Sequence, residues 1–352
     1  MMKYDTVSKQ NINLLFTFGR PFSPLYGWLM SLRAALYKKG VLKQHRLSVP
    51  VVSVGNLTMG GTGKTPVTIY LGQLLADMKP VIVSRGYKSK STSEVHIVSD
   101  GNKIISDVEF SGDEPVLIAE SLPGVPVLTS KKRSIAGQYA IDNFQAGIIV
   151  LDDGFQHLAL SRDLNVVLFK VDSFLGNNRI FPGGDMREPL KALQRADCFM
   201  LTCVDEENRE RALAIQKALA KRFPAIPTFL AAYQPSAIMD HSESMHDISS
   251  LSTQSLFAFC GLASPGSFQR TLTRANIDIA GFKVFKDHHG YSGEELKELV
   301  RDAKKSGAQG LITTEKDMVK LKHMTCDFPL MALRMSVVPE EGFDRFVFNQ
   351  LR

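Results

Sequence analysis

The sequence predicts an α/β protein built on a parallel β-sheet with helices on both of its faces. Three observations support this. Short apolar runs rich in β-branched residues recur along the chain, stretches with helical spacing separate them, and a glycine-rich turn follows the first run. With 352 residues, of which 44% are hydrophobic and 22% charged, the chain has the composition of a soluble globular protein and room for two domains.

The N-terminal segment, 1–46, differs from the rest in charge. The first fifty residues carry eight lysines and arginines against one acidic residue, while the whole chain has a net charge of only +6. The remaining chain is therefore close to neutral. The basic character does not form a nucleic-acid-binding face on the main body, and no nucleic-acid partner is expected.

The same segment contains the apolar stretch "PFSPLYGWLMSL" at 21–32. Its twelve residues are too few to span a bilayer, which needs about 20. The spacing predicts an amphipathic helix lying in a membrane interface. The alternative is a helix packed on the protein's own core. The side chains that define the apolar face are Leu25, Leu29, Leu32 and Leu36, with Tyr26 and Trp28 nearby.

The main domain is predicted over 47–224. Apolar runs there read as strands, and the intervening segments 66–78 and 131–144 have helical spacing. Strands that alternate with helices indicate a parallel sheet. The expected strands lie within 49–56, 79–87, 125–130, 146–157, 163–172 and 198–205.

A smaller α/β domain is predicted over 225–352. Its expected helices are 267–276 and 293–307. Its expected strands lie within 226–235, 255–265, 279–287 and 310–317.

The glycine-rich turn "TMGGTGKT" resembles the phosphate-binding pattern G-x-x-x-x-G-K-[ST], with Thr58 in place of the first glycine. Its glycines would let the backbone wrap phosphate oxygens. Lys64 would reach the β- and γ-phosphates, and the Thr65 hydroxyl would bind Mg²⁺. The alternative is a glycine-rich turn that merely ends a strand. The predicted nucleotide-binding residues are Thr58, Met59, Gly60, Gly61, Thr62, Gly63, Lys64 and Thr65.

Two aspartates, Asp152 and Asp153, follow the apolar run "GIIVL" at the carboxyl end of a predicted strand, where parallel sheets bind ligands. Together with Thr65 they are the predicted Mg²⁺ ligands, although an aspartate there can also cap a helix. The expected cofactors are therefore ATP and Mg²⁺. Gln156 and His157 come next and would either contact the metal shell or satisfy the turn.

The segment "FSGDEP" offers an acid–base group. A kinase that phosphorylates a hydroxyl commonly uses an aspartate to orient or deprotonate it. Asp113 and Glu114 are candidates, but Asp-Glu beside a proline is also a good helix N-terminus. His288 and His289 lie in "KDHHGYS" without further metal ligands at suitable spacing, so a histidine paired with a carboxylate is the better interpretation.

Other polar and charged residues stand at predicted strand ends or in ordered loops. They are possible contacts for substrate or phosphate: Arg85, Glu114, Gln156, His157, Arg187, Glu188 and Lys316. The four cysteines form no C-x-x-C pair, which argues against a zinc site and fits a reducing compartment.

These motifs together resemble the tetraacyldisaccharide 4'-kinases, the lipid A 4'-kinases of Gram-negative bacteria. The resemblance runs from about residue 20 to about residue 325 and includes a threonine at the position of Thr58. The stretches that carry it, in order, are "VGNLTMGGTGKTP", "VSRGY", "GDEP", "LDDGFQH", "REPL", "FCGLASPGSF", "DHHGYS" and "TTEKDMVKL". The wording before "REP" departs from the family's usual form.

The resemblance implies transfer of the γ-phosphate of ATP to the 4'-hydroxyl of a tetraacylated disaccharide 1-phosphate, which gives lipid IVA. It makes Asp113 the catalytic base, assisted by a histidine of "DHH", and assigns Asp152 and Asp153 to the metal site. We expect that histidine to be His288, with His289 as the alternative. The resemblance also implies two α/β domains and an N-terminal helix in the cytoplasmic face of the inner membrane. The expected partners are the lipid A precursor and that membrane surface, and a monomer is expected.

A MinD/ParA-type ATPase is the alternative, since those proteins share "GGTGKT" and some bind membranes through amphipathic helices. They place a signature lysine before the two glycines, where this chain has Met59, and they lack "DDGFQH".

Overall fold

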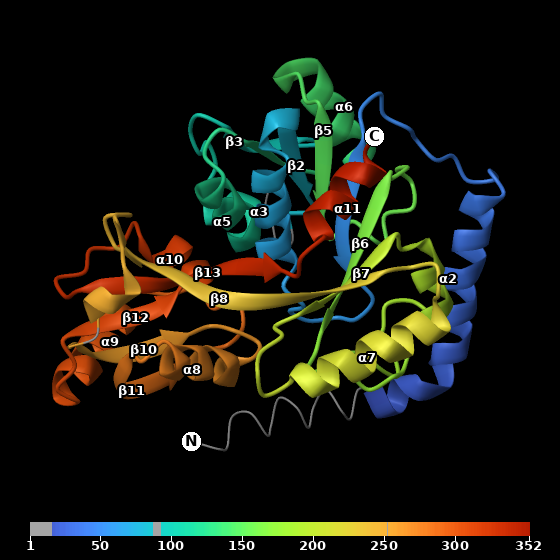
Figure 1. Ribbon diagram of the computed structural model, residues 1–352. Coiled ribbons are helices and arrows are strands. Elements are labelled where there is room, and N and C mark those ends of the chain that lie inside the picture. The colour runs from blue at the N-terminus through green and yellow to red at the C-terminus, as the bar shows by residue number, and fades with distance from the viewer. Residues whose placement is uncertain (1–15, 87–92, 252) are drawn as a thin grey trace. The chain divides into compact units, whose positions relative to one another are not determined.

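The apolar runs form strands and the segments between them form helices in a computed structural model that describes residues 16–86, 93–251 and 253–352 (Figure 1). The predicted fold class is confirmed as a mixed α/β fold with a large, mostly parallel sheet. The chain divides into two compact units. Unit 1 comprises Met1–Arg85, Ser130–Ala232 and Pro339–Arg352, and unit 2 comprises Gly86–Thr129 and Tyr233–Val338. The domain limits drawn from the sequence remain a prediction.

Unit 1 holds parallel strands in the order β8-β7-β6-β1-β5-β2. Most of these strands are buried along their whole length, as expected for a parallel sheet with helices on its faces. The strands are β1 (Val51–Asn56), β2 (Pro80–Ser84), β5 (Ile148–Asp152), β6 (Leu164–Lys170), β7 (Cys198–Thr202) and the first part of β8 (Thr228–Asp240). The helices are α2 (Ser23–Lys38), α3 (Lys64–Leu74), α6 (Arg133–Phe144), α7 (Arg209–Arg222) and α11 (Phe343–Gln350), with short 3-10 turns at Arg20–Phe22, Ala76–Met78 and Leu190–Arg195.

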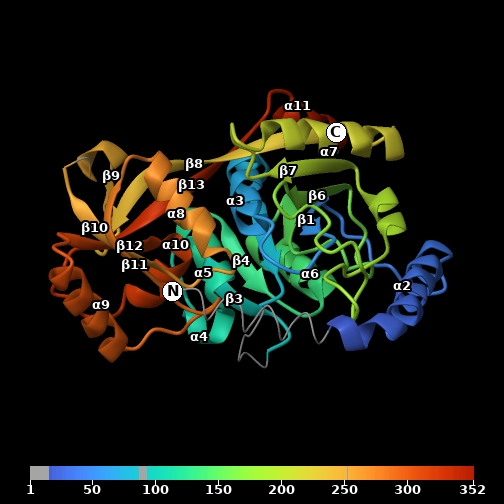
Figure 2. The ribbon, with the colours of Figure 1, turned by 90° about the horizontal axis from the view of Figure 1, so that it is seen from below.

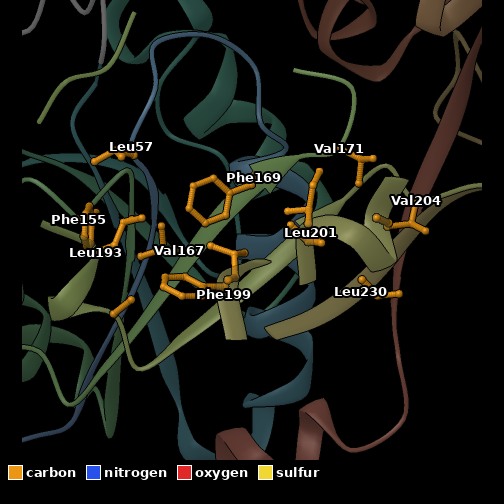
Figure 3. Packing of buried hydrophobic residues seen from close by; sticks show 14 of the residues in the cluster. Leu57, Phe155, Val167, Phe169, Val171, Leu193, Phe199, Leu201, Val204 and Leu230 are labelled. Carbon is orange, nitrogen blue, oxygen red and sulfur yellow. The ribbon is translucent and has the colours of Figure 1, made fainter. Parts of the chain in front are cut away.

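A cluster of large apolar side chains fills one side of unit 1 (Figure 3). Phe199 on β7 lies at its centre, fully buried, with its ring centroid 5.7 Å from that of Phe169 and 5.5 Å from that of Phe223. The cluster also includes Ile215 and Leu219 of α7, and Figure 2 shows that helix beside β7. The cluster includes Leu57, which joins β1 to the phosphate loop.

The C-terminal helix α11 completes unit 1. Phe343 is fully buried and contacts the ring of Phe229 at 5.3 Å. Asp344 accepts a hydrogen bond of 2.5 Å from the Tyr70 hydroxyl on α3, and burial together with that bond raises the pKa of Tyr70. The last helix of the chain therefore packs against the helix that follows the phosphate loop.

Unit 2 has a parallel strand group in the order β11-β10-β12-β13, and β13 is also next to the second part of β8. These are β10 (Ser255–Cys260), β11 (Asp278–Val284), β12 (Gly310–Thr314) and β13 (Leu330–Pro339). Two short antiparallel pairings also occur, of β9 (Met245–His246) with β8 and of β3 (His96–Asp100) with β4 (Pro126–Thr129). The helices are α4 (Val108–Ser111), α5 (Asp113–Ser121), α8 (Pro265–Arg274), α9 (Gly293–Lys305) and α10 (Glu315–Leu321), with a 3-10 turn at Ile248–Leu251.

Helix α2 forms where the sequence predicts an amphipathic helix, and it leaves much of its apolar surface exposed. Gly27 is the buried residue of this helix. A Cβ at Gly27 would lie 3.1 Å from the Ile180 side chain and 3.7 Å from the Pro189 side chain. Trp28 is 59% exposed and Leu25 is 57% exposed. Within residues 16–86, 93–251 and 253–352, the structure has no helix with the length and apolar character needed to cross a bilayer.

Replacing Phe199 with alanine is expected to lower the free energy of unfolding by about 3–5 kcal/mol, because it removes a fully buried ring from two edge-on ring contacts. Urea denaturation of purified protein measures the change. Leu213→Ala on α7 is the control, since that side chain is 45% exposed, and a loss no larger than in this control would contradict the assigned core.

Candidate functional site

The phosphate loop follows β1 directly and is held from both ends. The Asn56 side chain donates a hydrogen bond of 2.7 Å to the Thr58 carbonyl and accepts one of 3.3 Å from Lys64 Nζ. The Thr202 hydroxyl, on β7, donates a 2.8 Å hydrogen bond to the carbonyl of Thr62. The sheet therefore fixes the shape of the loop.

The loop leads into the N-terminus of α3, which starts at Lys64. Gly60 and Gly63 have positive φ angles of 109° and 84°, which side-chain-bearing residues rarely adopt. Thr65 is buried in the first turn of this helix. A helix N-terminus that follows a glycine-rich turn is a favourable place for phosphate. Met59 is 40% exposed, and its N–H donates to the Asp185 carbonyl.

Asp153, just past β5, pairs with cations. Its carboxylate accepts hydrogen bonds of 2.9 Å from Arg187, and Lys64 Nζ lies 3.6 Å away. Burial acts to raise the pKa of Asp153, but Lys64 and Arg187 outweigh it, so the pKa is lowered and the carboxylate stays ionised. A φ of 53° turns the backbone at this residue. Asp153 thus fixes two cations that can face phosphate.

Asp152, the last residue of β5, is buried and accepts hydrogen bonds from two hydroxyls, those of Thr68 at 3.3 Å and Ser84 at 3.1 Å. Its carboxylate is therefore fixed in direction by α3 and β2. The adjacent aspartates have different surroundings, one among hydroxyls and the other among cations.

The donor chemistry near the loop suits Mg²⁺ in part. Asp152 and Thr65 supply the oxygen donors that Mg²⁺ prefers, and Mg²⁺ is usually held by one or two carboxylates plus substrate phosphates. Asp153 fits less well, because its oxygens already pair with Lys64 and Arg187. Within the described part of the chain, no three His, Cys, Asp or Glu side chains form a group that could hold a metal ion.

Gln156 ties the turn after β5 to the loop. Its side-chain amide donates 2.8 Å to the Asn56 carbonyl and accepts a 3.4 Å hydrogen bond from Arg187. Its carbonyl accepts a 3.3 Å hydrogen bond from Arg33 on α2. A chain of polar contacts therefore leads from the exposed N-terminal helix through Gln156 and Arg187 to Asp153.

His157 has a different environment. Its Nε2 is buried without a hydrogen-bond partner. Burial, followed by the charges of Arg133 and Arg162, lowers its pKa to about 4. His157 is thus neutral near pH 7 and supports the turn. Arg85 is exposed just after β2.

Glu188 is buried and pairs with Arg195 at 2.7 Å, and the Arg195 guanidinium lies 4.6 Å from the ring centroid of Phe155. One Glu188 oxygen is buried without a hydrogen-bond partner. Two neighbouring residues of the "REP" motif therefore have different partners. Arg187 pairs with Asp153, and Glu188 forms a separate buried ion pair with Arg195.

In unit 2, Asp113 is the first residue of α5, after Gly112 with a φ of 88°. Its carboxylate is 2.9 Å from His288 Nδ1 and accepts the Glu114 N–H. Burial acts to raise its pKa, but the hydrogen bond from His288 and the charges of Lys316 and Lys320 lower it well below the usual range. Asp113 is both a helix N-terminal residue and the centre of a polar cluster.

The two adjacent histidines have different partners. His288, with a φ of 57°, directs Nδ1 to Asp113 and Nε2 to Lys316 Nζ at 3.2 Å. His289 instead stacks on Phe285 and bonds Glu295 at 2.9 Å. The left-handed turn at His288 separates the two rings.

Lys316 is the last predicted residue of this cluster. Its Nζ lies 3.6 Å from Glu114, 3.7 Å from Asp287 and 4.0 Å from Asp113. The structure thus groups the predicted residues Asp113, Glu114, His288 and Lys316 in unit 2, and the phosphate-loop, Asp152, Asp153, Gln156 and Arg187 set in unit 1.

Two cationic residues of these groups, Arg133 and Lys320, are not among the site residues predicted from the sequence. Arg133, at the start of α6, is buried and lies 3.5 Å from the Asp153 carbonyl; burial chiefly lowers its pKa to about 10, so it stays charged near neutral pH. Lys320 lies 3.3 Å from Asp113. The only signal for Lys320 is its spacing, four residues after Lys316 on one helix.

Comparison with known proteins identifies the family. The family model described as tetraacyldisaccharide-1-P 4'-kinase matches residues 15–352. The chain belongs to this family. Among curated relatives, the tetraacyldisaccharide 4'-kinase of Desulfotalea psychrophila is 45% identical over 342 residues, 97% of this chain and 98% of that protein. The enzyme of the same name from Syntrophus aciditrophicus is 38% identical, over 94% of this chain and 92% of that protein.

A solved structure agrees with the family assignment. The "apo" form of LpxK from Aquifex aeolicus, crystallised in complex with ATP, superposes with a TM-score of 0.78 at 34% sequence identity. The match covers 94% of this chain and 98% of that chain. The predicted family and fold class are thereby confirmed.

Replacing His157 with glutamine is expected to reduce the loss of thermal stability on acidification. The folded protein holds the pKa of His157 at about 4 against an ordinary 6.5. Between pH 6.5 and 4 the unfolded chain therefore binds a proton that the folded protein does not, and stability falls.

Melting temperatures of both proteins from pH 7 to pH 4 measure the difference. His323→Gln, at an exposed position, controls for the loss of a histidine. Parallel curves for His157→Gln and wild type would contradict the assignment.

Proposed function

We propose that this protein transfers the γ-phosphoryl group of ATP to the 4'-hydroxyl of a tetraacyldisaccharide 1-phosphate, giving lipid IVA in lipid A synthesis. The observation that carries the proposal is the family match over residues 15–352, and the ATP-bound relative supports the choice of nucleotide. The protein is proposed to work as a monomer at the cytoplasmic face of the inner membrane.

The phosphate side of the reaction uses unit 1. The loop and the N-terminus of α3 bind the β- and γ-phosphates, with Lys64 as the nearest cation. Arg187, held by Asp153, is a second cation available to the charge that develops on the transferred group. When bound, Mg²⁺ would neutralise phosphate charge, and Asp152 and Thr65 are the residues that would hold it.

The acceptor side uses the pair Asp113 and His288. The acceptor oxygen forms a bond to the γ-phosphorus while the bond from phosphorus to the bridging oxygen breaks, and that electron pair leaves with ADP. Asp113, hydrogen-bonded to His288, accepts the hydroxyl proton. Its pKa is low for a base, but a loose phosphoryl-transfer transition state needs orientation of the hydroxyl more than strong basicity.

The acceptor carries acyl chains, and α2 offers a surface for a lipid bilayer. Its exposed apolar residues lie beside Arg20, Lys38 and Lys39, which suit anionic headgroups. A helix that only packed on the protein's own core would not leave Trp28 and Leu25 more than half exposed. We therefore propose that α2 lies in the membrane interface.

A MinD/ParA-type ATPase is the competing function. It would account for the phosphate loop and the exposed helix but leaves Asp113, His288 and their lysines without a role.

An assay with labelled ATP and the disaccharide 1-phosphate in mixed micelles tests the function. Wild-type protein is expected to label the lipid, and Asp113→Ala to lower kcat by about 10² or more with ATP binding retained, because general-base loss typically has that effect. Asp327→Ala, an exposed carboxylate of the same unit, is the control. ATP hydrolysis without lipid labelling would favour the competing ATPase, and a kcat for Asp113→Ala within threefold of wild type would overturn the role of Asp113.

Membrane binding is tested by replacing Leu25, Trp28 and Leu32 together with serine. Flotation on vesicles that contain anionic lipid is expected to fall at least about tenfold, because the apolar burial that holds the helix is lost. Leu213→Ser with Val284→Ser changes exposed apolar residues elsewhere and is expected to leave flotation unchanged. Unchanged flotation of the triple variant would refute interfacial binding by α2.

A further inference from the structure

Asp113, the proposed proton acceptor, is held by a group of buried residues that have no role in the reaction as described. We call Asp317, Lys320 and Gly261 the support of Asp113. The support begins at Asp317, a fully buried carboxylate on α10. Its Oδ2 accepts a 2.7 Å hydrogen bond from the Thr314 hydroxyl and a 3.0 Å hydrogen bond from the Gly261 N–H. Its Oδ1 is buried without a hydrogen-bond partner. Because only one oxygen of this buried carboxylate accepts hydrogen bonds, its negative charge requires a cation close by.

Lys320 is that cation. It follows Asp317 by three residues on α10, so both side chains lie on one helical face. Its Nζ is 3.6 Å from Asp317 Oδ1 and 3.3 Å from Asp113 Oδ2, and its side chain is only 9% exposed. The ammonium makes no hydrogen bond of good geometry, so its contacts are ion pairs. Lys320 therefore bridges two buried carboxylates.

Gly261 couples this support to the histidine of the pair. Its N–H donates to Asp317, and its carbonyl accepts a 3.3 Å hydrogen bond from the backbone N–H of His288. A Cβ at this position would lie 3.0 Å from Asp317 Oδ1 and 3.1 Å from the Lys286 carbonyl. A side chain at this position would crowd both Asp317 and the loop that leads to His288.

Tyr291 is a buried neighbour of the Lys320 ammonium. The Lys320 ammonium lies 5.9 Å from the centroid of its ring, and burial, then the charge of Asp317, raises the pKa of the tyrosine hydroxyl. At that distance the ring adds a cation–π contact to the two ion pairs of Lys320. Lys320 thus has a fixed position rather than a range of surface rotamers.

We propose that Lys320, held by Asp317, is a positioning residue that fixes the direction and the charge of the Asp113 carboxylate for catalysis. This role rests on the proposed function. Lys320 contacts the Asp113 carboxylate and is 9% exposed, whereas His288 and Lys316 are more exposed, at 20% and 17%. The motifs "FCG" and "TTEKDMVKL" therefore share one proposed role. They supply Gly261, Asp317 and Lys320, which together hold the Asp113 carboxylate.

The competing explanation is that Lys320 only stabilises the packing of α10 against α5. The chain contains a matched control for it. Lys322, 14% exposed near the end of α10, pairs with Glu120 on α5 and with Glu243, but has no contact with Asp113. Lys320→Met and Lys322→Met each remove one buried ammonium between the same two helices, and differ in whether Asp113 loses a partner.

The experiment measures kcat, KM for ATP, the pH profile of kcat and the melting temperature for wild type and both variants, with labelled ATP and the lipid acceptor. Lys320→Met is expected to lower kcat at least about 30-fold with the KM for ATP within about twofold of wild type. The acid limb of its profile should move up by about one pH unit or more, because a carboxyl that loses a nearby cation has a higher pKa.

That expectation takes account of the charges around Asp113. The groups that remain beside Asp113 are His288, which hydrogen-bonds to it, and the cation Lys316. Lys316 also pairs with Glu114 and Asp287, which weakens its effect on Asp113. Burial acts to raise the pKa of Asp113, and without Lys320 fewer positive charges act to lower it. The pKa of Asp113 therefore rises, and kcat falls at a higher pH on acidification.

Lys322→Met is expected to keep kcat within threefold of wild type and the acid limb in place, whatever its melting temperature. A Lys320→Met kcat within threefold of wild type, or equal losses in both variants, would overturn the positioning role. Wild-type protein that fails to label the lipid would overturn the proposed function and this role with it, so the two failures are distinguishable.

If Lys320→Met does not fold, Asp317→Asn decides the question. Its amide oxygen still accepts the hydrogen bonds from Gly261 and Thr314, but the charge that holds Lys320 is lost. A fall in kcat of at least about fivefold with the KM for ATP unchanged supports the positioning role, and a smaller fall contradicts it.

Discussion

A carboxylate taken out of water needs cations or hydrogen-bond donors close to it, and both functional regions of this protein depend on that constraint. In unit 1, Asp153 satisfies it with Lys64 and Arg187. In unit 2, Asp113 satisfies it with His288 and lysines of α10. In each case the requirement that stabilises the anion also holds cationic side chains in fixed positions beside it.

Features of the candidate sites that depend on neighbouring residues in the chain could be predicted from the sequence. The phosphate loop, the buried strand before Asp152 and the glycine before Asp113 could all be predicted, because a strand, a tight turn and a helix start are set by neighbouring residues. The sequence also predicted α2, and it left open whether the apolar face of that helix would be covered. The exposure of Trp28 came from the structure.

Relationships that depend on tertiary packing could not be predicted. Lys320 meets Asp113 because α10 packs against α5, although about two hundred residues separate them in the chain. The different surroundings of Asp152 and Asp153 follow from a left-handed backbone turn between a strand and a loop, which two consecutive aspartates do not reveal. Likewise, His288 and His289 are indistinguishable in sequence, and a positive φ at His288 gives them separate partners.

The position of α11 has a consequence for synthesis of the chain. Unit 1 is interrupted by unit 2, and Phe343 and Asp344, which pack against Phe229 and Tyr70, come after the whole of unit 2. Proteins made from the N-terminus tend to fold as their domains emerge. Here the helix that follows the phosphate loop lacks a neighbour until the ribosome has made residue 344. The nucleotide-binding unit therefore completes its packing last, although most of its residues are made first.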